Sequence, residues 1–520
     1  MATIRRNTPQ LAIAGLAALL GFSSACSGQS QKLGTIDFPT SGSAAARPHF
    51  IRGVLFLHSF EYDSAATAFR EAQRIDPAFA MAYWGDAMTY NHPVWNQQDT
   101  ATGRAVLTRL GSTHDGRKAK APTHREQLYL EAVEVLYGNG AKAYRDTLYS
   151  SAMQKVVSAH PEDTEAQAFF ALSLLGLNQG VRDVPTYMRA AAIVEPIFEK
   201  NPDHPGAAHY IIHAYDDPAH AQRGLKAARA YSAIAPGAAH AQHMTTHIFL
   251  AMGMWDDVVS QNEIASGHDH GRWTPNHYTV WLNYAYLQQG RYARAREMVE
   301  QMRQHAGAEP PLRQLWGLTE MRGHYVIETE DWGSPVVGWK VDPSPLGDGG
   351  RAYWTFITGY SAIKRGDHAA AATALTTLSE INSAGKSDED EAINQILELE
   401  LKSLVRLRDG ARDDAVTLMR EAAKRADALA VDFGPPSIVK PPHELFGEIL
   451  LELGRAKEAQ LEFRRSLELA PKRARSLLGL MRASVAAGDR RSAKDASATL
   501  GAVWHGADAV QRSIVTSASM

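Results

Sequence analysis

The chain has almost no cysteine: Cys26 is the only one among 520 residues. No intramolecular disulfide can therefore form, and cysteine-ligated metals and thiol catalysis are excluded for the rest of the chain. An excess of one charge is also absent, because 54 Lys and Arg stand against 57 Asp and Glu, for a formal net charge of −3. Without a clustered basic face the sequence offers no footprint for nucleic acid, and we expect no such partner.

Long apolar runs are missing as well, and the one apolar segment reads as an export signal. Arg5 and Arg6 precede an apolar stretch over residues 11–22, about a dozen residues and too short to span a bilayer permanently. Small residues follow, and then Cys26. We therefore predict a signal peptide over residues 1–26 and a flexible linker rich in Ser, Gly and Ala over residues 27–47.

The position of Cys26 resembles the lipid-attachment cysteine of bacterial lipoproteins, although Ser23 stands where that motif usually has leucine. The alternative is simple cleavage near Ala25, which would release a soluble periplasmic protein. The resemblance implies a bacterial cell-envelope location, either periplasmic or anchored to the outer membrane. Membrane contact would then come only through a lipid on the N-terminus.

What the sequence has in quantity is an internal repeat. Small, aromatic and proline residues recur at the spacing of a helix-turn-helix unit, in which small residues let two helices approach and proline ends the second one. The clearest units are marked by Gly53, Phe56, Ala65, Phe69, Ala72 and Pro77, and by Gly447, Gly454, Ala459, Phe463 and Pro471. This pattern resembles the 34-residue tetratricopeptide repeat (TPR) over most of residues 48–500.

The resemblance implies an all-α solenoid of stacked helical hairpins. We expect an N-terminal array over residues 48–327, a Gly- and Pro-rich irregular insert over 328–350, a C-terminal array over 351–500 and a tail over 501–520. The motifs His204-Pro-Gly-Ala-Ala-His and His243-Met-Thr-Thr-His further resemble a His-motif-bearing subgroup of exported bacterial TPR proteins. That subgroup implies a fold and export, and no biochemical role.

Several of the 21 histidines follow the repeat. His209 and His213 fall at positions 5 and 9 of one unit, and His243 and His247 fall at the same positions 34 residues later. Within each pair the i, i+4 spacing puts both imidazoles on one helical face. The TPR resemblance implies that this face lines the concave groove, and the predicted groove residues are His58, Asn91, His92, His209, His213, Asp216, His240, His243, His247 and His277.

Paired histidines on neighbouring helices are typical of metal sites. We predict that His209, His213, His243 and His247 bind a transition metal ion, with Zn, Cu, Fe and Ni all compatible with imidazole. Asp216 and Asp217, one turn further on, are candidates for proton transfer.

Three interpretations of the histidines stay open: metal binding, recognition of a peptide or small ligand, and a purely structural network. The predicted function is a TPR scaffold that binds a protein, peptide or small ligand in its concave groove and carries a histidine metal site. The alternative is a metal-dependent enzyme, hydrolytic or redox, built on the same cluster.

Overall fold

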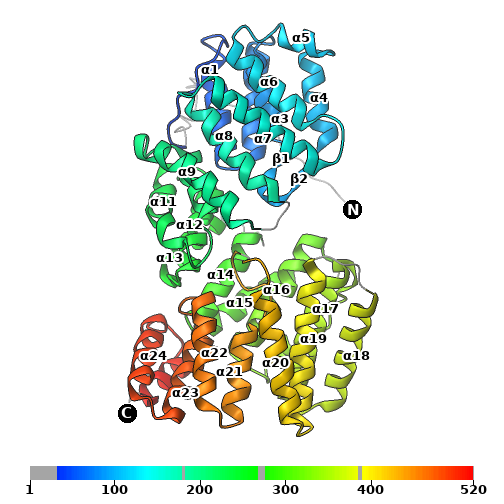
Figure 1. The fold of residues 1–520 in the computed structure, drawn as a ribbon, viewed down its shortest axis with the longest axis vertical. Helices are drawn as coiled ribbons and strands as arrows, with labels where there is room; N and C mark the ends of the chain where they lie inside the picture. Colours follow the sequence, from blue (N-terminus) through cyan, green and yellow to red (C-terminus); the bar gives the residue numbers. More distant parts are fainter. Residues whose placement is uncertain are drawn as a thin grey trace, which may run out of the picture. The chain divides into compact units, whose positions relative to one another are not determined.

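The computed structural model describes residues 32–178, 182–267, 276–307, 309–384, 389–431 and 433–518. Over these residues the chain is all-α, and its only strands are the two residues on each side of one hairpin. Consecutive helices pair as antiparallel hairpins and stack side by side (Figure 1). The predicted TPR-type α-solenoid is confirmed.

The first array begins near the predicted start and contains the hairpin. Its elements are α1 (Arg47–His58), α2 (Tyr62–Ile75), α3 (Ala80–Met88), β1 (Asn91–His92), η1 (Pro93–Trp95), β2 (Gln97–Gln98), α4 (Thr100–Leu110), α5 (His114–Lys118), α6 (His124–Leu136), α7 (Lys142–Ala159), α8 (Thr164–Leu175), η2 (Gly176–Asn178) and α9 (Val184–Lys200).

The central helices carry most of the candidate site residues. They are α10 (Pro205–Ala214), α11 (Ala221–Ile234), α12 (Ala239–Ala251), α13 (Trp255–Gly267), α14 (His277–Gln288), α15 (Tyr292–Ala306) and α16 (Leu312–Thr329). The remaining elements are η3 (Pro335–Gly338), η4 (Ser344–Leu346), α17 (Gly347–Lys364), α18 (His368–Ala384), α19 (Glu389–Arg408), α20 (Arg412–Asp427), α21 (Pro442–Glu452), α22 (Ala456–Leu469), α23 (Ala474–Ala487), α24 (Arg490–Val503) and α25 (Ala509–Ala518).

The repeat residues explain how closely the hairpins pack. Phe69 on α2 fits between Gly53 and Gly85, where an added Cβ would lie 2.6 Å and 2.3 Å from its ring. In the other array Phe463 lies against Gly447 and Gly479 in the same way, at 2.9 Å and 2.2 Å. A side chain at any of these glycines would push the helices apart, so the glycines are required by packing.

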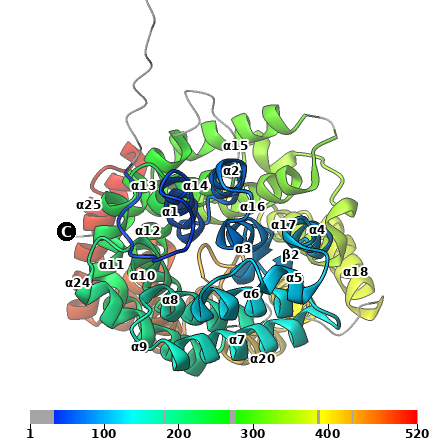
Figure 2. The same ribbon diagram turned by 90° about the horizontal axis from the view of Figure 1, so that it is seen from above.

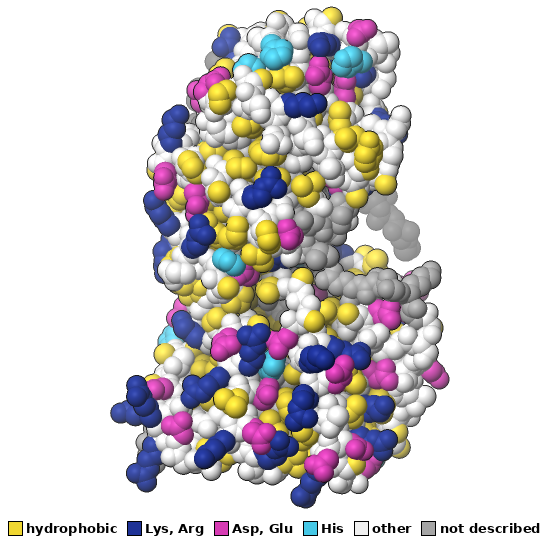
Figure 3. Space-filling model, in the orientation of Figure 1, with side chains coloured by type: hydrophobic (Ala, Val, Ile, Leu, Met, Phe, Trp, Pro, Cys, Tyr) yellow, Lys and Arg dark blue, Asp and Glu magenta, His cyan; other side chains and the backbone are white. Residues whose placement is uncertain are grey.

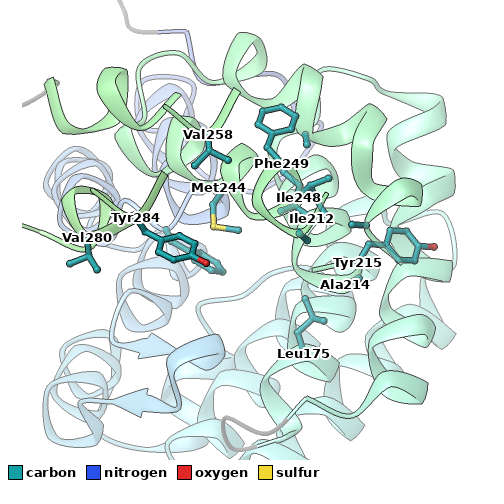
Figure 4. Packing of buried hydrophobic residues seen from close by; sticks show 14 of the residues in the cluster. Leu175, Ile212, Ala214, Tyr215, Met244, Ile248, Phe249, Val258, Val280 and Tyr284 are labelled. Atoms are coloured by element: carbon teal, nitrogen blue, oxygen red, sulfur yellow. The ribbon is translucent and has the colours of Figure 1, made fainter. Parts of the chain in front are cut away.

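Around the central helices the core is continuous and apolar. Figure 4 shows Ile212 and Tyr215 at the end of α10 beside Met244, Ile248 and Phe249 of α12, with residues of α13 and α14 closing the cluster. This core fixes the spacing of the first helices, and therefore of the histidines that they carry.

The stacking also brings distant segments together. Helix α1 contacts α10, which follows it by about 150 residues, and Figure 2 shows α10 to α13 side by side around the same region. The contact places the end of α1 against the first histidine pair.

Three predicted boundaries differ from the structure. Residues 32–46, predicted as flexible linker, pack against the array because the side chains of Leu33 and Phe38 are buried and Thr35 N–H donates to the carbonyl of Asp203. The irregular insert is shorter than predicted, since α16 continues to Thr329 and α17 begins at Gly347. The predicted tail contains the end of α24 and all of α25. Cys26 and the predicted signal lie outside the described residues.

None of the described helices combines the length and the apolar character that a membrane span needs. On the face shown in Figure 3, basic and acidic side chains are interspersed and histidine occupies only small areas. Most of the predicted groove histidines are in fact buried.

Candidate metal centre

The helices α10, α12 and α14 each present histidines toward a neighbouring first helix. The structure divides the histidines predicted from the sequence into two groups. The first triad is His209, His213 and His240, and the second triad is His243, His247 and His277. In each triad one nitrogen from every ring lies within 4.8 Å of the others. The four histidines predicted as one metal site are thus shared between two triads, and His240 and His277 complete them.

The first triad has three buried ring nitrogens without a hydrogen-bond partner. The Nε2 atoms of His209, His213 and His240 are all buried and have no hydrogen-bond partner. His209 donates from Nδ1 to the backbone carbonyl of His58 over 2.6 Å, which leaves its Nε2 unprotonated in the neutral ring. Buried polar atoms normally find partners, so three unpartnered nitrogens in one triad indicate a missing ligand.

In the second triad, two rings are held by hydrogen bonds at the far nitrogen. His247 donates from Nδ1 to Oδ2 of Asp216 over 2.5 Å, and His243 donates from Nδ1 to Oδ1 of Asn262 over 2.8 Å. Such bonds fix the tautomer and orientation of metal-binding histidines. They leave both Nε2 atoms as acceptors, and these two atoms face each other at 3.3 Å.

The short distance between the Nε2 atoms of His243 and His247 limits what can lie between them. Two lone pairs at 3.3 Å repel each other unless a proton or a cation lies between them. Two nitrogens bound to one tetrahedral ion at roughly 2.0–2.1 Å would be about 3.3 Å apart. The separation of His243 and His247 fits two ligands of one metal ion, and it also fits a hydrogen bond between the two rings.

Burial favours the neutral form of five of the six triad imidazoles. It lowers the pKa of His209 and of His277 to about 3, and lowers the pKa of His213, His240 and His243 well below the ordinary value. The other histidines nearby lower these pKa values further. A neutral ring is the form that binds metal, so protons do not compete for these nitrogens near neutral pH.

Aromatic side chains make the surroundings apolar. The ring of Phe60 lies 4.3 Å from that of His209 and 5.5 Å from that of His240, and its residue adopts a left-handed φ of 54°. Trp281 lies 4.3 Å from His247, and Phe433 reaches the same ring at 5.4 Å. A left-handed residue recurs at this turn between the two helices of a hairpin, as at Gly253 and Gly290, and at Phe60 the turn places an aromatic ring against the first triad.

A third histidine cluster was not predicted from the sequence. His58 and His204 bond the two oxygens of Glu165 at 2.7 Å and 3.0 Å, and all three are buried. Burial would raise the pKa of Glu165, yet the two histidines hold that pKa at about 2. His58 also bonds the hydroxyl of Tyr210, and His204 Nδ1 caps α10 by accepting from the N–H of Ala207.

This cluster differs from the triads because both nitrogens of each ring already have partners. Its hydrogen bonds link α1, α8 and α10 to one another. Its one sequence signal is the helix-capping position of His204 just before Pro205; nothing local identifies Glu165.

The other residues that the sequence predicted for the site are not members of either triad. Asp217 binds Arg182 and His220, and does not contact either triad, whereas Asp216 contacts the second triad through His247. Asn91 and His92 belong to the small hairpin, where Gln98 donates to Asn91. His92 stacks on Tyr62, with ring centroids 3.8 Å apart.

Comparisons with known proteins match the helical repeat. A family model described as tetratricopeptide repeat matches residues 443–473, the segment that contains most of α21 and all of α22. A comparison with curated proteins gives no match.

Similar solved structures include a human IFIT1 dimer with m7Gppp-AAAA, at 14% identity over 91% of this chain and 92% of that chain, with a TM-score of 0.37. Another is the APC/C hetero-tetramer Cut9–Hcn1, at 10% identity over 92% and 97%, with a TM-score of 0.31. Yeast Tom70 aligns at 11% identity over 91% and 95%, with a TM-score of 0.27. The stacked helical hairpins and the matched repeat support a tetratricopeptide-repeat protein.

Proposed function

We propose that the protein is a TPR scaffold that binds transition-metal ions through the two buried histidine triads. The observation that carries the proposal is the set of unpartnered Nε2 atoms on His209, His213 and His240, beside the two Nε2 atoms that face each other in the second triad. A peptide or other large ligand is less well supported at this place, because five of the six rings are buried.

The hydrogen bonds at the far nitrogens also support metal binding. Asp216, Asn262 and the carbonyl of His58 each accept from the Nδ1 of a triad histidine. This is the arrangement by which proteins orient imidazole ligands and raise their basicity. In the first triad the Nε2 atoms stay unpaired, whereas in the third cluster Glu165 pairs the Nε2 atoms of His58 and His204.

The scaffold role extends this proposal to partners. TPR arrays commonly bind proteins or ligands on their concave surface, and the present chain has the same stacked first helices. We therefore place partner binding on the surface around the buried centre, with the metal ions as part of the folded scaffold.

Elemental analysis of the purified protein tests the proposal. Chelator-treated protein offered Zn, Cu, Fe or Ni should take up metal in whole-number stoichiometry. His213→Asn and His243→Asn should each lower that uptake, whereas His324→Asn should not, although His324 is a buried histidine on the neighbouring helix α16. If no metal binds the folded protein, the triads are a structural network and the proposal fails.

Export remains part of the proposal and rests on the sequence of residues 1–26. Arg5, Arg6, the apolar stretch and Cys26 support secretion followed by lipid attachment in a bacterial cell envelope. Fractionation of cells that express the full chain tests this, with Cys26→Ser as the variant. Lipid attachment predicts that the wild type is found with membranes and that the variant is released; an intracellular, uncleaved chain would contradict export.

A further inference from the structure

The two triads are copies of one site. His209 and His213 become His243 and His247 one repeat later, and each pair is completed by a histidine from the start of the next first helix, His240 on α12 or His277 on α14. The interface between α10 and α12 and the interface between α12 and α14 therefore each have a set of three imidazole donors. Helix α12 supplies ligands to both triads.

The copies are also direct neighbours. The rings of His213 and His247 have their centroids 5.9 Å apart, and those of His240 and His243 are 6.2 Å apart. Ligands of the two triads therefore adjoin, so two ions held by them would be direct neighbours.

The charge of the surroundings restricts which ions fit. All six candidate ligands are imidazoles, which bind metal in their neutral form, and the carboxylates that the described residues place beside them are Asp216, on His247 Nδ1, and Glu61, which accepts from the backbone N–H of His240 over 3.1 Å. Two divalent ions would bring four positive charges into this buried place against those two carboxylates. Uncompensated buried charge is costly, so two monovalent ions fit the donor set better.

Copper is the transition metal that meets this requirement. It forms a stable monovalent ion and accepts imidazole nitrogen. On these grounds, and resting on the proposed metal-binding function, we infer that the two triads together hold a pair of copper ions, reduced to Cu(I), which reacts with dioxygen as a small bridging ligand.

The reaction balances without a proton or another reductant. Each Cu(I) loses one electron to become Cu(II), and dioxygen takes both electrons to become a peroxide dianion bound between the two ions. The ions and their bridging ligand carry a total charge of +2 before and after the step. The buried site therefore does not have to accommodate new charge. The reverse step returns dioxygen and two Cu(I). A small diatomic ligand also suits a centre in which His209 and His243 are fully buried.

The test is anaerobic titration of the full chain with Cu(I), followed by exposure to air. The expected result is two copper ions per chain and, after oxidation, an electron paramagnetic resonance spectrum without the signal of isolated Cu(II), because the two spins couple. His240→Asn and His277→Asn should each lower the stoichiometry to one copper and produce that isolated signal. His277 is partly exposed, which makes its variant the safer one for folding.

The outcomes separate this inference from the underlying proposal. One copper per chain, two copper ions with uncoupled signals, or binding of zinc in preference to Cu(I) would overturn the dicopper inference and leave metal binding intact. Absence of every metal would overturn both. His324→Asn serves as the control, since it changes a buried histidine outside the triads and should keep two coupled copper ions.

Discussion

Asp216→Asn offers the sharpest test of how the second triad is built. The Asp216 carboxylate accepts the Nδ1–H of His247 at 2.5 Å, and both side chains are buried. Asparagine keeps an acceptor oxygen of the same reach, so the change removes the charge and leaves the ring orientation largely intact. Loss of such a partner typically weakens metal binding 10–100-fold, which corresponds to about 1.4–2.7 kcal/mol.

The effect can be read from metal-dependent stability. At a free metal concentration of 100 times the wild-type Kd, binding stabilises the wild type by about 2.7 kcal/mol. A tenfold weaker variant gains about 1.4 kcal/mol at the same concentration, and a 100-fold weaker one gains about 0.4 kcal/mol. The assay is urea unfolding with and without metal, alongside competition with a chelator of known affinity.

The matched control is Asp163→Asn, which alters a buried carboxylate bonded to Tyr129 and Arg125 away from the triads. It should lower the stability of metal-free and metal-bound protein equally. Unchanged metal affinity in Asp216→Asn, with a folded variant, would refute the idea that this carboxylate orients and strengthens a metal ligand.

Three further substitutions test other parts of the structure. Trp95→Ala should speed the loss of metal to a chelator severalfold at unchanged stoichiometry, because Trp95 covers His240 at 5.7 Å between ring centroids while 40% of its own surface is exposed. Glu444→Ala should destabilise the protein by about 1.5–3 kcal/mol in urea unfolding, since it removes one of the two buried carboxylates that pair with Arg473 and leaves Glu328 as the other. His324→Leu should weaken the acid sensitivity of stability. Burial, together with the nearby Arg473, lowers the pKa of His324 to about 3. The contribution of His324 to the free energy of unfolding is therefore complete above pH 6.5. Below that it falls by about 1.4 kcal/mol per pH unit, down to pH 3.

Each of these substitutions has an internal control. Trp332→Ala alters a tryptophan of the insert and should leave metal exchange unchanged. Glu458→Ala removes an exposed partner of Arg455 and should have little effect on stability. His505→Leu changes an exposed histidine, and acid unfolding should follow the wild type. Equal effects in a variant and its control would mean that the stated contact is not the cause.

Much of the fold could be predicted because it depends on local spacing. Glycine and phenylalanine at fixed repeat positions predict closely packed hairpins, and Phe69 and Phe463 pack in the same way in both arrays. The spacing of His209 and His213 likewise predicts a shared helical face. These features follow from helix geometry and need no knowledge of distant residues.

The grouping and burial of the histidines could not be predicted in the same way. Repeat position gives the face of a helix, but not which neighbour a side chain reaches. His240 lies one turn before His243 on α12, so it joins the histidines of α10, while His243 joins those of α14. The rings that cover the triads, such as Phe433, come from segments far along the chain, which a local pattern does not record.

The register nevertheless contained a signal for the pairing. His240 and His277 both stand at the beginning of a first helix, and each follows a position 5 and 9 pair in the preceding unit. In the structure the histidine at the start of each of these helices adds a third imidazole to the pair of the preceding unit. A solenoid that repeats this combination in two successive units makes two adjacent sites joined by one helix, and the second site follows from the repeat itself. This is why the dicopper inference depends on α12: it alone contributes histidines to both triads.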